Sequence, residues 1–283
     1  MYILKNDQLE IDIIDPVKDK KFLGSRYCTG GYIFQVIDLK KGNLFAGPQY
    51  PNPDFDVFHG QGAPEVFVTA LNEEKCNFGD NVYVIGLGSV TRTSLTTPFH
   101  VRNNPVVAEF CTWRINEKKD CLEMTSNCAF NQWNFVITKK IALNYRTVSS
   151  QIKISNTGKK NIPILWYAHP FFPFPGNGKA CIFSPQIRLA ENAGYFINNE
   201  GVIEIKRTYN WKRGLYQKIA YNSDEILSAI QYHPLLGKVS INCDFVPESI
   251  AIWANDITFS FEPSYKVNIK SGEQKIWGLS YCF

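Results

Sequence analysis

Two side chains in this sequence occupy positions where acid–base chemistry could take place. The first is His169, which ends the apolar run Asn161–Ala168 and is followed by the proline-rich loop Pro170–Pro175. An imidazole at the end of a strand can face a cleft while the sheet holds its backbone. A structural histidine under an aromatic loop would leave the same pattern. We interpret His169 as a candidate proton donor or acceptor.

The second candidate is Glu262, which stands directly before Pro263 at the end of a strongly apolar run. In that run Phe259 and Phe261 alternate with Ser260, so a strand would place Ser260 and Glu262 together on the opposite face. A carboxylate in such a setting can be partly buried, with a raised pKa suited to proton transfer. The alternative is an ordinary charge at a strand end that faces solvent.

The other histidines carry weaker signals. His59 lies in the glycine-rich turn Phe58–Glu65, where glycines would let a ligand approach the backbone but would equally suit a plain tight turn. His100 and His233 lie near prolines in polar segments. We expect both of them at the surface.

The sequence predicts that the elements that must position these residues are almost entirely strands. Segments rich in β-branched and aromatic residues are separated by Gly, Pro, Asn and Asp clusters. Only short stretches, for instance Asp224–Tyr232, could form a helix of two turns. The pattern predicts an all-β fold, a large antiparallel β-sandwich forming one domain over residues 1–283. The clearest predicted strands are Tyr32–Asp38, Glu65–Ala70, Asn81–Ile85, Trp133–Ile137, Ser150–Ser155 and Ser249–Phe261.

Composition excludes several classes of function. The net charge of +4 comes from 30 basic and 26 acidic residues spread along the chain, which argues against a nucleic-acid partner. The sequence shows neither a signal-peptide pattern nor an apolar run long enough to cross a membrane, so we expect a cytoplasmic protein. The eight cysteines form no CxxC or Cys/His arrangement, so we expect reduced, mostly buried thiols and no metal site.

Two motifs resemble the galactose mutarotase-like superfamily, which includes the aldose 1-epimerases. The stretch Asn156–Phe172 has an Asn-x-Gly turn, a strand and a His-Pro-Phe-Phe signature. The stretch Phe261–Tyr281 has a glutamate, a Gly-Glu turn and a last strand with a tyrosine near its end. Weaker similarities at Gly24–Ile33 and Val84–Arg92 extend the resemblance over most of the chain.

The resemblance implies an aldose 1-epimerase activity on a small-molecule sugar. By this analogy His169 protonates the ring oxygen and Glu262 takes the proton of the anomeric hydroxyl. Rotation about the C1–C2 bond and reclosure then give the other anomer, and no cofactor is needed. His59 corresponds to a second active-site histidine that binds the substrate.

The sequence departs from the family pattern after His59. Many members have an arginine shortly after this histidine, which holds a phosphate in the hexose-6-phosphate epimerases, whereas Gln61 stands nearby here. Neutral hexoses are therefore expected to bind better than their 6-phosphates, unless Arg26 or Arg92 substitutes. The expected substrate-binding residues are His59, Arg26, Glu65 and Trp166.

Three rival interpretations stay open at this stage. The same sandwich could bind carbohydrate without catalysing anomer exchange. Glycoside hydrolysis would need a second carboxylate opposite Glu262, for which Glu65 and Glu109 are the candidates. The third alternative is a structural or interaction domain without a sugar site. The sequence predicts no particular oligomeric state.

Overall fold

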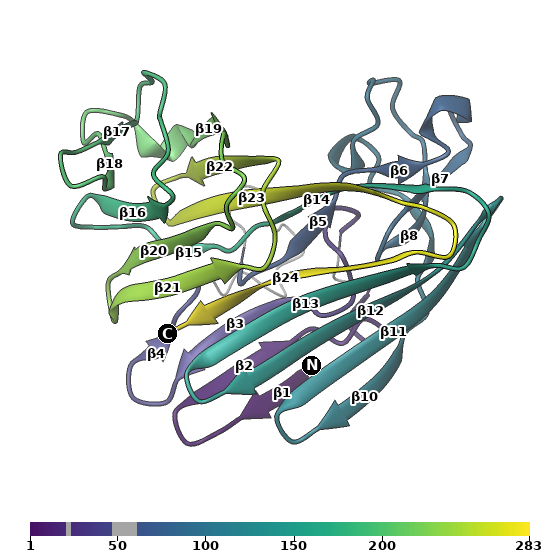
Figure 1. The fold of residues 1–283 in the computed structure, drawn as a ribbon, viewed down its shortest axis with the longest axis horizontal. Helices are drawn as coiled ribbons and strands as arrows, with labels where there is room; N and C mark the ends of the chain where they lie inside the picture. The colour runs from purple at the N-terminus through teal and green to yellow at the C-terminus, as the bar shows by residue number, and fades with distance from the viewer. Residues whose placement is uncertain (21–23, 47–60) are drawn as a thin grey trace.

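The computed structural model describes residues 1–20, 24–46 and 61–283. Over these residues the chain forms β-strands and three short 3₁₀ segments, at Glu73–Lys75, Val101–Asn103 and Trp211–Arg213. Every strand pairing is antiparallel, and Figure 1 shows the strands stacked in layers. The predicted all-β antiparallel sandwich is therefore confirmed.

One layer is a ten-stranded sheet that runs the length of the molecule. Long hairpins build its middle, because apolar and polar residues alternate over ten or more positions in β11 and β12. The strands, in spatial order, are β10 (Arg114–Lys118), β11 (Cys121–Phe130), β12 (Trp133–Asn144), β13 (Thr147–Asn156), β24 (Gln274–Cys282), β21 (Gly237–Cys243), β20 (Ser228–His233), β16 (Lys179–Ser184), β18 (Ile203–Ile205) and β17 (Tyr195–Ile197).

The second layer is a six-stranded sheet that packs face to face on the first. Contacts between aromatic rings join the two layers. Trp166 lies 6.1 Å from Trp277, and Phe261 lies 5.5 Å from Phe183, between ring centroids. The strands of this sheet are β19 (Leu215–Ala220), β22 (Ser249–Ala254), β23 (Thr258–Ile269), β14 (Ile162–Ala168) and β5 (Glu65–Phe67), with β15 (Phe172–Pro173) paired to one end of β23.

Two four-stranded sheets complete the described part of the chain. The N-terminal sheet lies beside the long hairpins of the large sheet, and the other projects at the upper right of Figure 1, where β6, β7 and β8 are labelled. The first consists of β1 (Tyr2–Lys5), β2 (Leu9–Ile13), β3 (Ile33–Asp38) and β4 (Gly42–Asn43). The second consists of β6 (Ala70–Leu71), β7 (Asn81–Val84), β8 (Gly88–Thr91) and β9 (Val107–Phe110).

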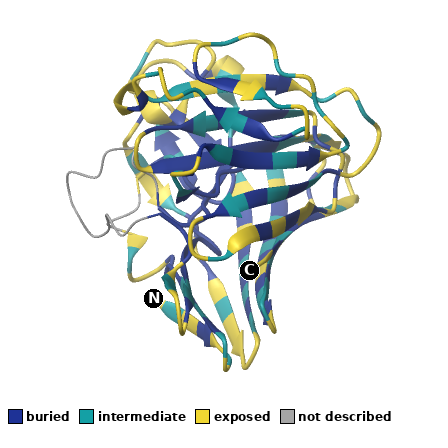
Figure 2. Ribbon diagram, turned by 90° about the vertical axis from the view of Figure 1, so that its left-hand side faces the viewer, coloured by how far each residue is buried: buried dark blue, intermediate teal, exposed yellow. Residues whose placement is uncertain are grey.

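Burial follows the two-residue period of the strands. Figure 2 shows buried and exposed bands alternating along them, as expected for sheets with one face in the core. One continuous apolar core extends from Leu4 near the N-terminus to Phe283 and joins residues of all four sheets. Six of the eight cysteines are buried and all eight are free thiols, while Cys121 is half-buried and Cys282 is exposed.

Three expectations about local structure were wrong. The predicted strand Glu65–Ala70 is divided, because β5 ends at Phe67 in the six-stranded sheet and Ala70 begins β6 in another sheet. The segment Asp224–Tyr232 does not form a helix. Its first part is an irregular loop and its second part belongs to β20, where Ala229 and Gln231 are buried in alternation. The predicted strand Ser249–Phe261 is two strands, β22 and β23, because Asn255 accepts hydrogen bonds from the backbone of Ile257 and Thr258 and closes a tight turn.

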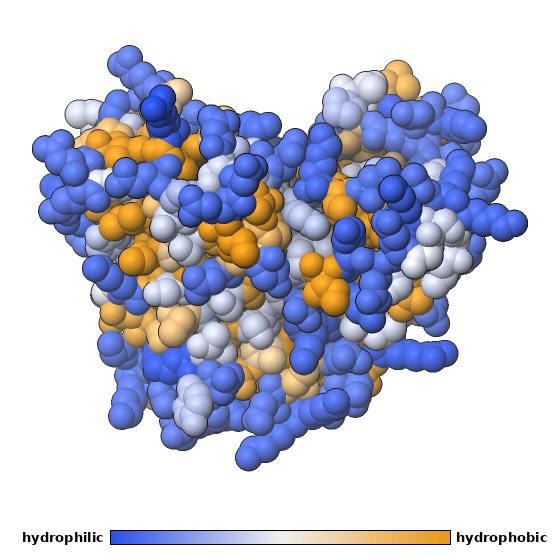
Figure 3. Space-filling model, in the orientation of Figure 1, coloured by the Kyte–Doolittle hydropathy of each residue, from blue (hydrophilic) through white to orange (hydrophobic). Residues whose placement is uncertain are grey.

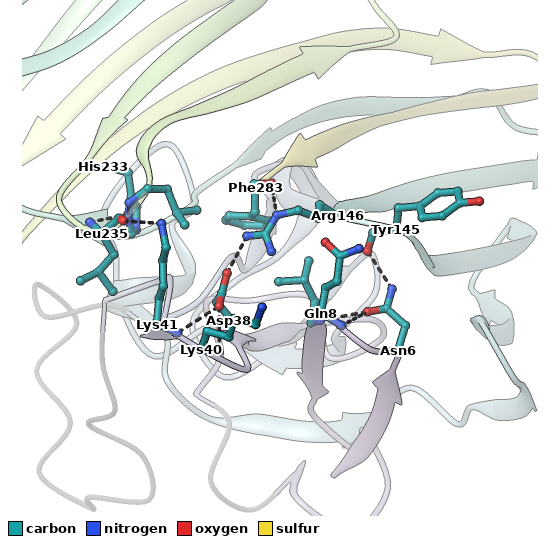
Figure 4. Close-up of polar contacts among 12 residues, drawn as sticks. Asn6, Gln8, Asp38, Lys40, Lys41, Tyr145, Arg146, His233, Leu235 and Phe283 are labelled. Carbon is teal, nitrogen blue, oxygen red and sulfur yellow. Dashed lines mark hydrogen bonds and ion pairs between the residues drawn. The ribbon is translucent and has the colours of Figure 1, made fainter.

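A polar cluster ties the N-terminal sheet to the rest of the fold (Figure 4). Arg146, in the turn between β12 and β13, donates to the Asp38 carboxylate at 2.6 Å and to the backbone oxygen of Phe283 at 2.7 Å. Lys41 donates to the backbone oxygen of Leu235 at 3.1 Å. Three turns that are distant in sequence are held together by these contacts.

Among the described residues, no helix is long and apolar enough to cross a membrane.

Candidate active site

His169 directly follows β14, and its position is fixed by backbone and ring contacts. Its backbone N–H donates to the oxygen of Pro64 at 2.9 Å. The imidazole stacks on Phe171 at 4.1 Å between centroids and meets the ring of Trp253 edge-on at 6.2 Å. With only 3% of its surface exposed, the side chain cannot swing freely.

Both ring nitrogens of His169 face side chains of β23. The Nδ1 atom lies 2.9 Å from Ser260 Oγ, and the Nε2 atom lies 3.3 Å from Glu262 Oε1. Strand alternation explains the arrangement, because Phe259 and Phe261 enter the core while Ser260 and Glu262 point to the other face. The structure thus brings together the histidine and glutamate that the sequence singled out.

Burial moves the pKa values of this pair in opposite directions. Loss of hydration holds the pKa of His169 well below its usual value, and the nearby charge of Arg26 lowers it further. Loss of hydration raises the pKa of Glu262 to about 7, and Arg26 only partly opposes this rise. A carboxylic acid that titrates near neutral pH beside an imidazole is a pair suited to proton transfer.

Arg26 is the cation whose charge acts on both members of the pair. Burial by itself lowers its pKa and its neighbours raise it, and the guanidinium stays charged at every working pH, as it does throughout proteins. Its hydrogen bond with the Tyr167 hydroxyl links the two side chains. Arg26 was expected from the sequence, and the structure places it in the wall of the same cavity.

The cavity has a volume of about 650 Å³ and lies on the outer face of the six-stranded sheet. Side chains of the paired strands β19, β22 and β23 form its floor. Residues directly opposite one another in paired strands point to the same face of the sheet. Tyr216, Trp253 and Ser260 form one row across β19, β22 and β23. Lys218, Ala251 and Glu262 form the next row, so the catalytic candidates lie at one edge of a floor that continues toward β19.

The surface is hollowed in the same region. In Figure 3 the upper outline is notched between two projections, which Figure 1 identifies as the part carrying β16–β19 and the part carrying β6–β8. Side chains on both sides contribute to the cavity, with Tyr216 from β19 on one side and His100 and Arg102 from the loop after β8 on the other. The histidine–glutamate pair is therefore open to a small molecule.

Two expected substrate-binding residues lie elsewhere. Glu65 and Trp166 are absent from the described cavity wall and point into the space between the sheets. The Glu65 carboxylate accepts hydrogen bonds from Trp166 Nε1, Lys139 Nζ and Ser150 Oγ, and forms a buried salt bridge with Lys139. These contacts occupy its oxygens, so Glu65 serves the core and is left out of the site that we propose.

Tyr167 is the neighbour that sequence reasoning missed. In β14 the side chains of Ile164 and Trp166 are buried between the sheets, while Leu165 and Tyr167 point to the cavity, on the same side as His169. The two-residue period counted back from His169 would have identified Tyr167 in place of Trp166. The same period counted from Glu262 identifies Ser260.

The remaining candidates are placed as follows. His59 lies outside the described residues. Arg92 is buried and donates to the backbone oxygens of Glu73 and Cys76, so it supports loops and does not line the cavity. Glu109 belongs to β9 and is likewise absent from the described cavity wall.

The two other histidines differ from each other. His100 is exposed as expected, although it also lines the cavity. The expectation for His233 was wrong, because only 3% of its surface is exposed. Its Nε2 atom lies 2.8 Å from the oxygen of Leu44, and its Nδ1 atom accepts from the backbone N–H groups of Leu235 and Leu236. These contacts hold His233 as a buried, neutral connector between two turns, and burial lowers its pKa accordingly.

Comparison with known proteins gives matches at the level of structure. No family model matches the chain, and no curated protein matches its sequence. A candidate aldose 1-epimerase from Escherichia coli K12 superposes with a TM-score of 0.59 at 13% identity, over 99% of this chain and 97% of that one.

Two galactose mutarotase-like proteins are also similar in structure. The one from Lactobacillus casei gives a TM-score of 0.57 at 11% identity, over 99% of both chains. The one from Clostridium acetobutylicum gives 0.55 at 10% identity, over 99% of this chain and 93% of that one. At these identities the similarity is one of fold.

Proposed function

We propose that this chain, which has the galactose mutarotase-like fold, interconverts the α and β anomers of an aldose. His169 would act as the general acid toward the ring oxygen and Glu262 as the general base toward the anomeric hydroxyl. The observation that carries the proposal is the 3.3 Å contact between His169 Nε2 and Glu262 Oε1 in the wall of a cavity. No cofactor enters this chemistry.

The spacing of the pair suits a hemiacetal. The ring oxygen and the anomeric hydroxyl are bonded to the same carbon, so the groups that serve them must also lie close together. Proton transfer requires each group to come within hydrogen-bond distance of its own oxygen. Two side chains whose Nε2 and Oε1 atoms lie 3.3 Å apart meet this requirement when a sugar places its ring oxygen and its anomeric hydroxyl against the pair.

The floor of the cavity offers a surface for the sugar ring. Trp253 and Tyr216 lie in one row of the sheet, beside the stacked rings of His169 and Phe171. Aromatic faces present an apolar surface with hydrogen-bond donors at the ring edge, which suits the C–H faces of a sugar. A volume of about 650 Å³ is ample for one monosaccharide.

Anomer exchange through this pair requires that it hold one proton. Because the pKa of Glu262 is raised to about 7 and that of His169 is lowered, the free pair holds this proton on Glu262, and it must pass to His169 across their 3.3 Å contact before His169 can act as the acid. The pair loses the proton as the pH rises above 7. The exchange rate should therefore fall about tenfold per pH unit well above pH 7.

The proposal is tested by magnetisation-exchange NMR on equilibrated D-glucose and D-galactose. The wild type is compared with His169→Asn and Glu262→Gln. Each replacement should lower the rate of anomer exchange by about 10²- to 10⁴-fold, which is the range of a general acid or base. Glu248→Gln is the matched control, because it removes the other carboxylate of the described cavity wall.

The outcomes separate the alternatives. Full activity in either His169→Asn or Glu262→Gln would show that the pair is wrongly assigned. Sugar binding without faster exchange in the wild type would favour carbohydrate recognition without catalysis. Glycoside hydrolysis gains no support from Glu65 or Glu109, since neither lines the described cavity. Release of reducing sugar from an oligosaccharide would nevertheless revive it.

A further inference from the structure

Two cysteine thiols meet in the core, between the sheet of β6–β9 and the ten-stranded sheet. Cys111 directly follows β9, and its backbone N–H donates to the oxygen of Leu87 at 2.8 Å. Cys128 belongs to β11 and lies on the face of that strand that Met124 and Ser126 also bury. The pair therefore links two sheets, and neither thiol lines the described wall of the cavity.

Tyr83 of β7 holds the two sulfur atoms together. Its ring packs on the large sheet, 5.4 Å from the ring of Phe130 and 5.9 Å from that of Phe135, between centroids. Its hydroxyl lies 3.2 Å from Cys111 Sγ and also forms a hydrogen bond with the thiol of Cys128. The two thiols hydrogen bond to each other in turn. One hydroxyl and two sulfurs thus form a closed group.

Contact between two thiols is the starting geometry of a disulfide. The sulfurs must approach to about 2.05 Å, and small rotations of two side chains that already touch supply this approach. The neighbouring thiol of Cys28 is engaged elsewhere, because it donates to the backbone oxygen of Gly30 at 3.5 Å. Burial also raises the pKa of Cys28 to about 12, so that thiol stays protonated.

The pair contains one thiol that ionises near neutral pH. The hydrogen bond with Cys111, followed by those with Tyr83 and Ser126, lowers the pKa of Cys128 to about 7 against the effect of burial. The same contact with Cys128, together with burial, raises the pKa of Cys111. Because the thiolate is the form that attacks an oxidant, Cys128 is the nucleophile and Cys111 is the thiol that resolves the product.

We propose that Cys111 and Cys128 form a reversible disulfide when the folded chain meets a hydroperoxide. The Cys128 thiolate attacks one oxygen of hydrogen peroxide and breaks the O–O bond, which gives a sulfenic acid and releases hydroxide. The Cys111 sulfur then attacks the Cys128 sulfur, and the thiol proton leaves with the departing hydroxyl as water. The two thiols are oxidised to the disulfide, and the peroxide is reduced to water once the hydroxide takes up the proton that Cys128 gave up.

The enclosure of the sulfurs favours a small oxidant. Cys111 is 9% exposed and Cys128 is 4% exposed, so hydrogen peroxide reaches them more easily than a bulky disulfide reagent does. The new bond ties the ten-stranded sheet to the sheet whose β8–β9 connection carries His100 and Arg102 of the cavity wall. The inference does not depend on the proposed function.

Peptide mapping by mass spectrometry tests the inference. The folded chain is treated with hydrogen peroxide, its remaining thiols are alkylated, and it is digested with trypsin. Cys121 and Cys128 share the tryptic peptide 120–139, so Cys121→Ser is introduced into every chain compared. The peptides 103–114 and 120–139 should then be joined in most molecules, with the loss of two hydrogen atoms, and dithiothreitol should separate them again.

Three further substitutions complete the test. Cys111→Ala and Cys128→Ala should each abolish the joined peptide. Cys181→Ala is the matched control, because Cys181 is equally buried and burial alone shifts its pKa. It should leave the yield of joined peptide unchanged.

Three results would overturn the inference. The first is that Cys111 and Cys128 are both recovered in alkylated form after peroxide treatment of the folded chain. The second is a link from either of them to Cys28. The third is a link between Cys111 and Cys128 that forms only after the chain has been unfolded in urea, since the proposed reaction depends on the folded contact.

Discussion

Replacement of Glu262 by glutamine should stabilise the fold at neutral and alkaline pH while it abolishes anomer exchange. The side chain is 8% exposed, and loss of hydration raises its pKa from 4.5 to about 7. The folded chain therefore holds a proton that the unfolded chain releases at lower pH. Ionisation of Glu262 in the fold opposes folding, and an uncharged amide of the same shape removes this cost.

The size and direction of the effect follow from linkage. Between pH 4.5 and 7 the folded state binds more protons at this site than the unfolded state does, so the free energy of unfolding falls as the pH rises. A rise from 4.5 to about 7 corresponds to about 3 kcal/mol at 1.36 kcal/mol per pH unit. Most of this difference should accumulate between pH 5 and pH 8, and none should be added above that range.

Urea unfolding of the wild type and Glu262→Gln at several pH values measures the difference. Titration of every other group is common to both chains to a first approximation, so the difference between the two free energies isolates this site. The gap should widen in favour of glutamine by about 2–3 kcal/mol from pH 5 to pH 8. Parallel curves over this range would refute the claim that burial holds Glu262 protonated.

Two further substitutions test how the site and the core are held. Ser260→Ala removes the partner of His169 Nδ1, so the imidazole loses the contact that orients it. Anomer exchange should become about tenfold slower and the pH profile of the exchange rate should shift, whereas an unchanged profile in the NMR assay would argue against this role of Ser260. Lys139→Met leaves the Glu65 carboxylate buried between the sheets without its cation. The free energy of unfolding, measured with urea, should fall by about 3–5 kcal/mol, and a fall of less than about 1 kcal/mol would mean that water or another group replaces the lysine.

The sequence by itself determined the features that depend on local pattern. Alternating apolar residues and closely spaced turn residues fix an antiparallel all-β fold, because the period of two admits no helix. The apolar run that ends at Ala168 placed His169 at the end of a strand, beside a loop. Alternation along the later strand placed Glu262 on the face away from Phe259 and Phe261. Each of these inferences needs only a few neighbouring residues.

Only the tertiary structure decided which face of each strand looks toward the cavity and which strands share it. Trp166 and Tyr167 are adjacent in sequence and point to opposite sides, and strand pairing decides which of them meets the core. His233 is buried because two distant turns close around it, a contact that no local pattern encodes.

The row that joins Lys218, Ala251 and Glu262 shows the same limit at the site. It exists only because β19, β22 and β23 pair in one particular register, and a shift of one residue would turn each of these side chains to the other face. The local pattern of a strand specifies its two faces, whereas the register is chosen by the packing of whole sheets. The acid–base pair could therefore be predicted from the sequence, and the residues that share the cavity floor with it could not.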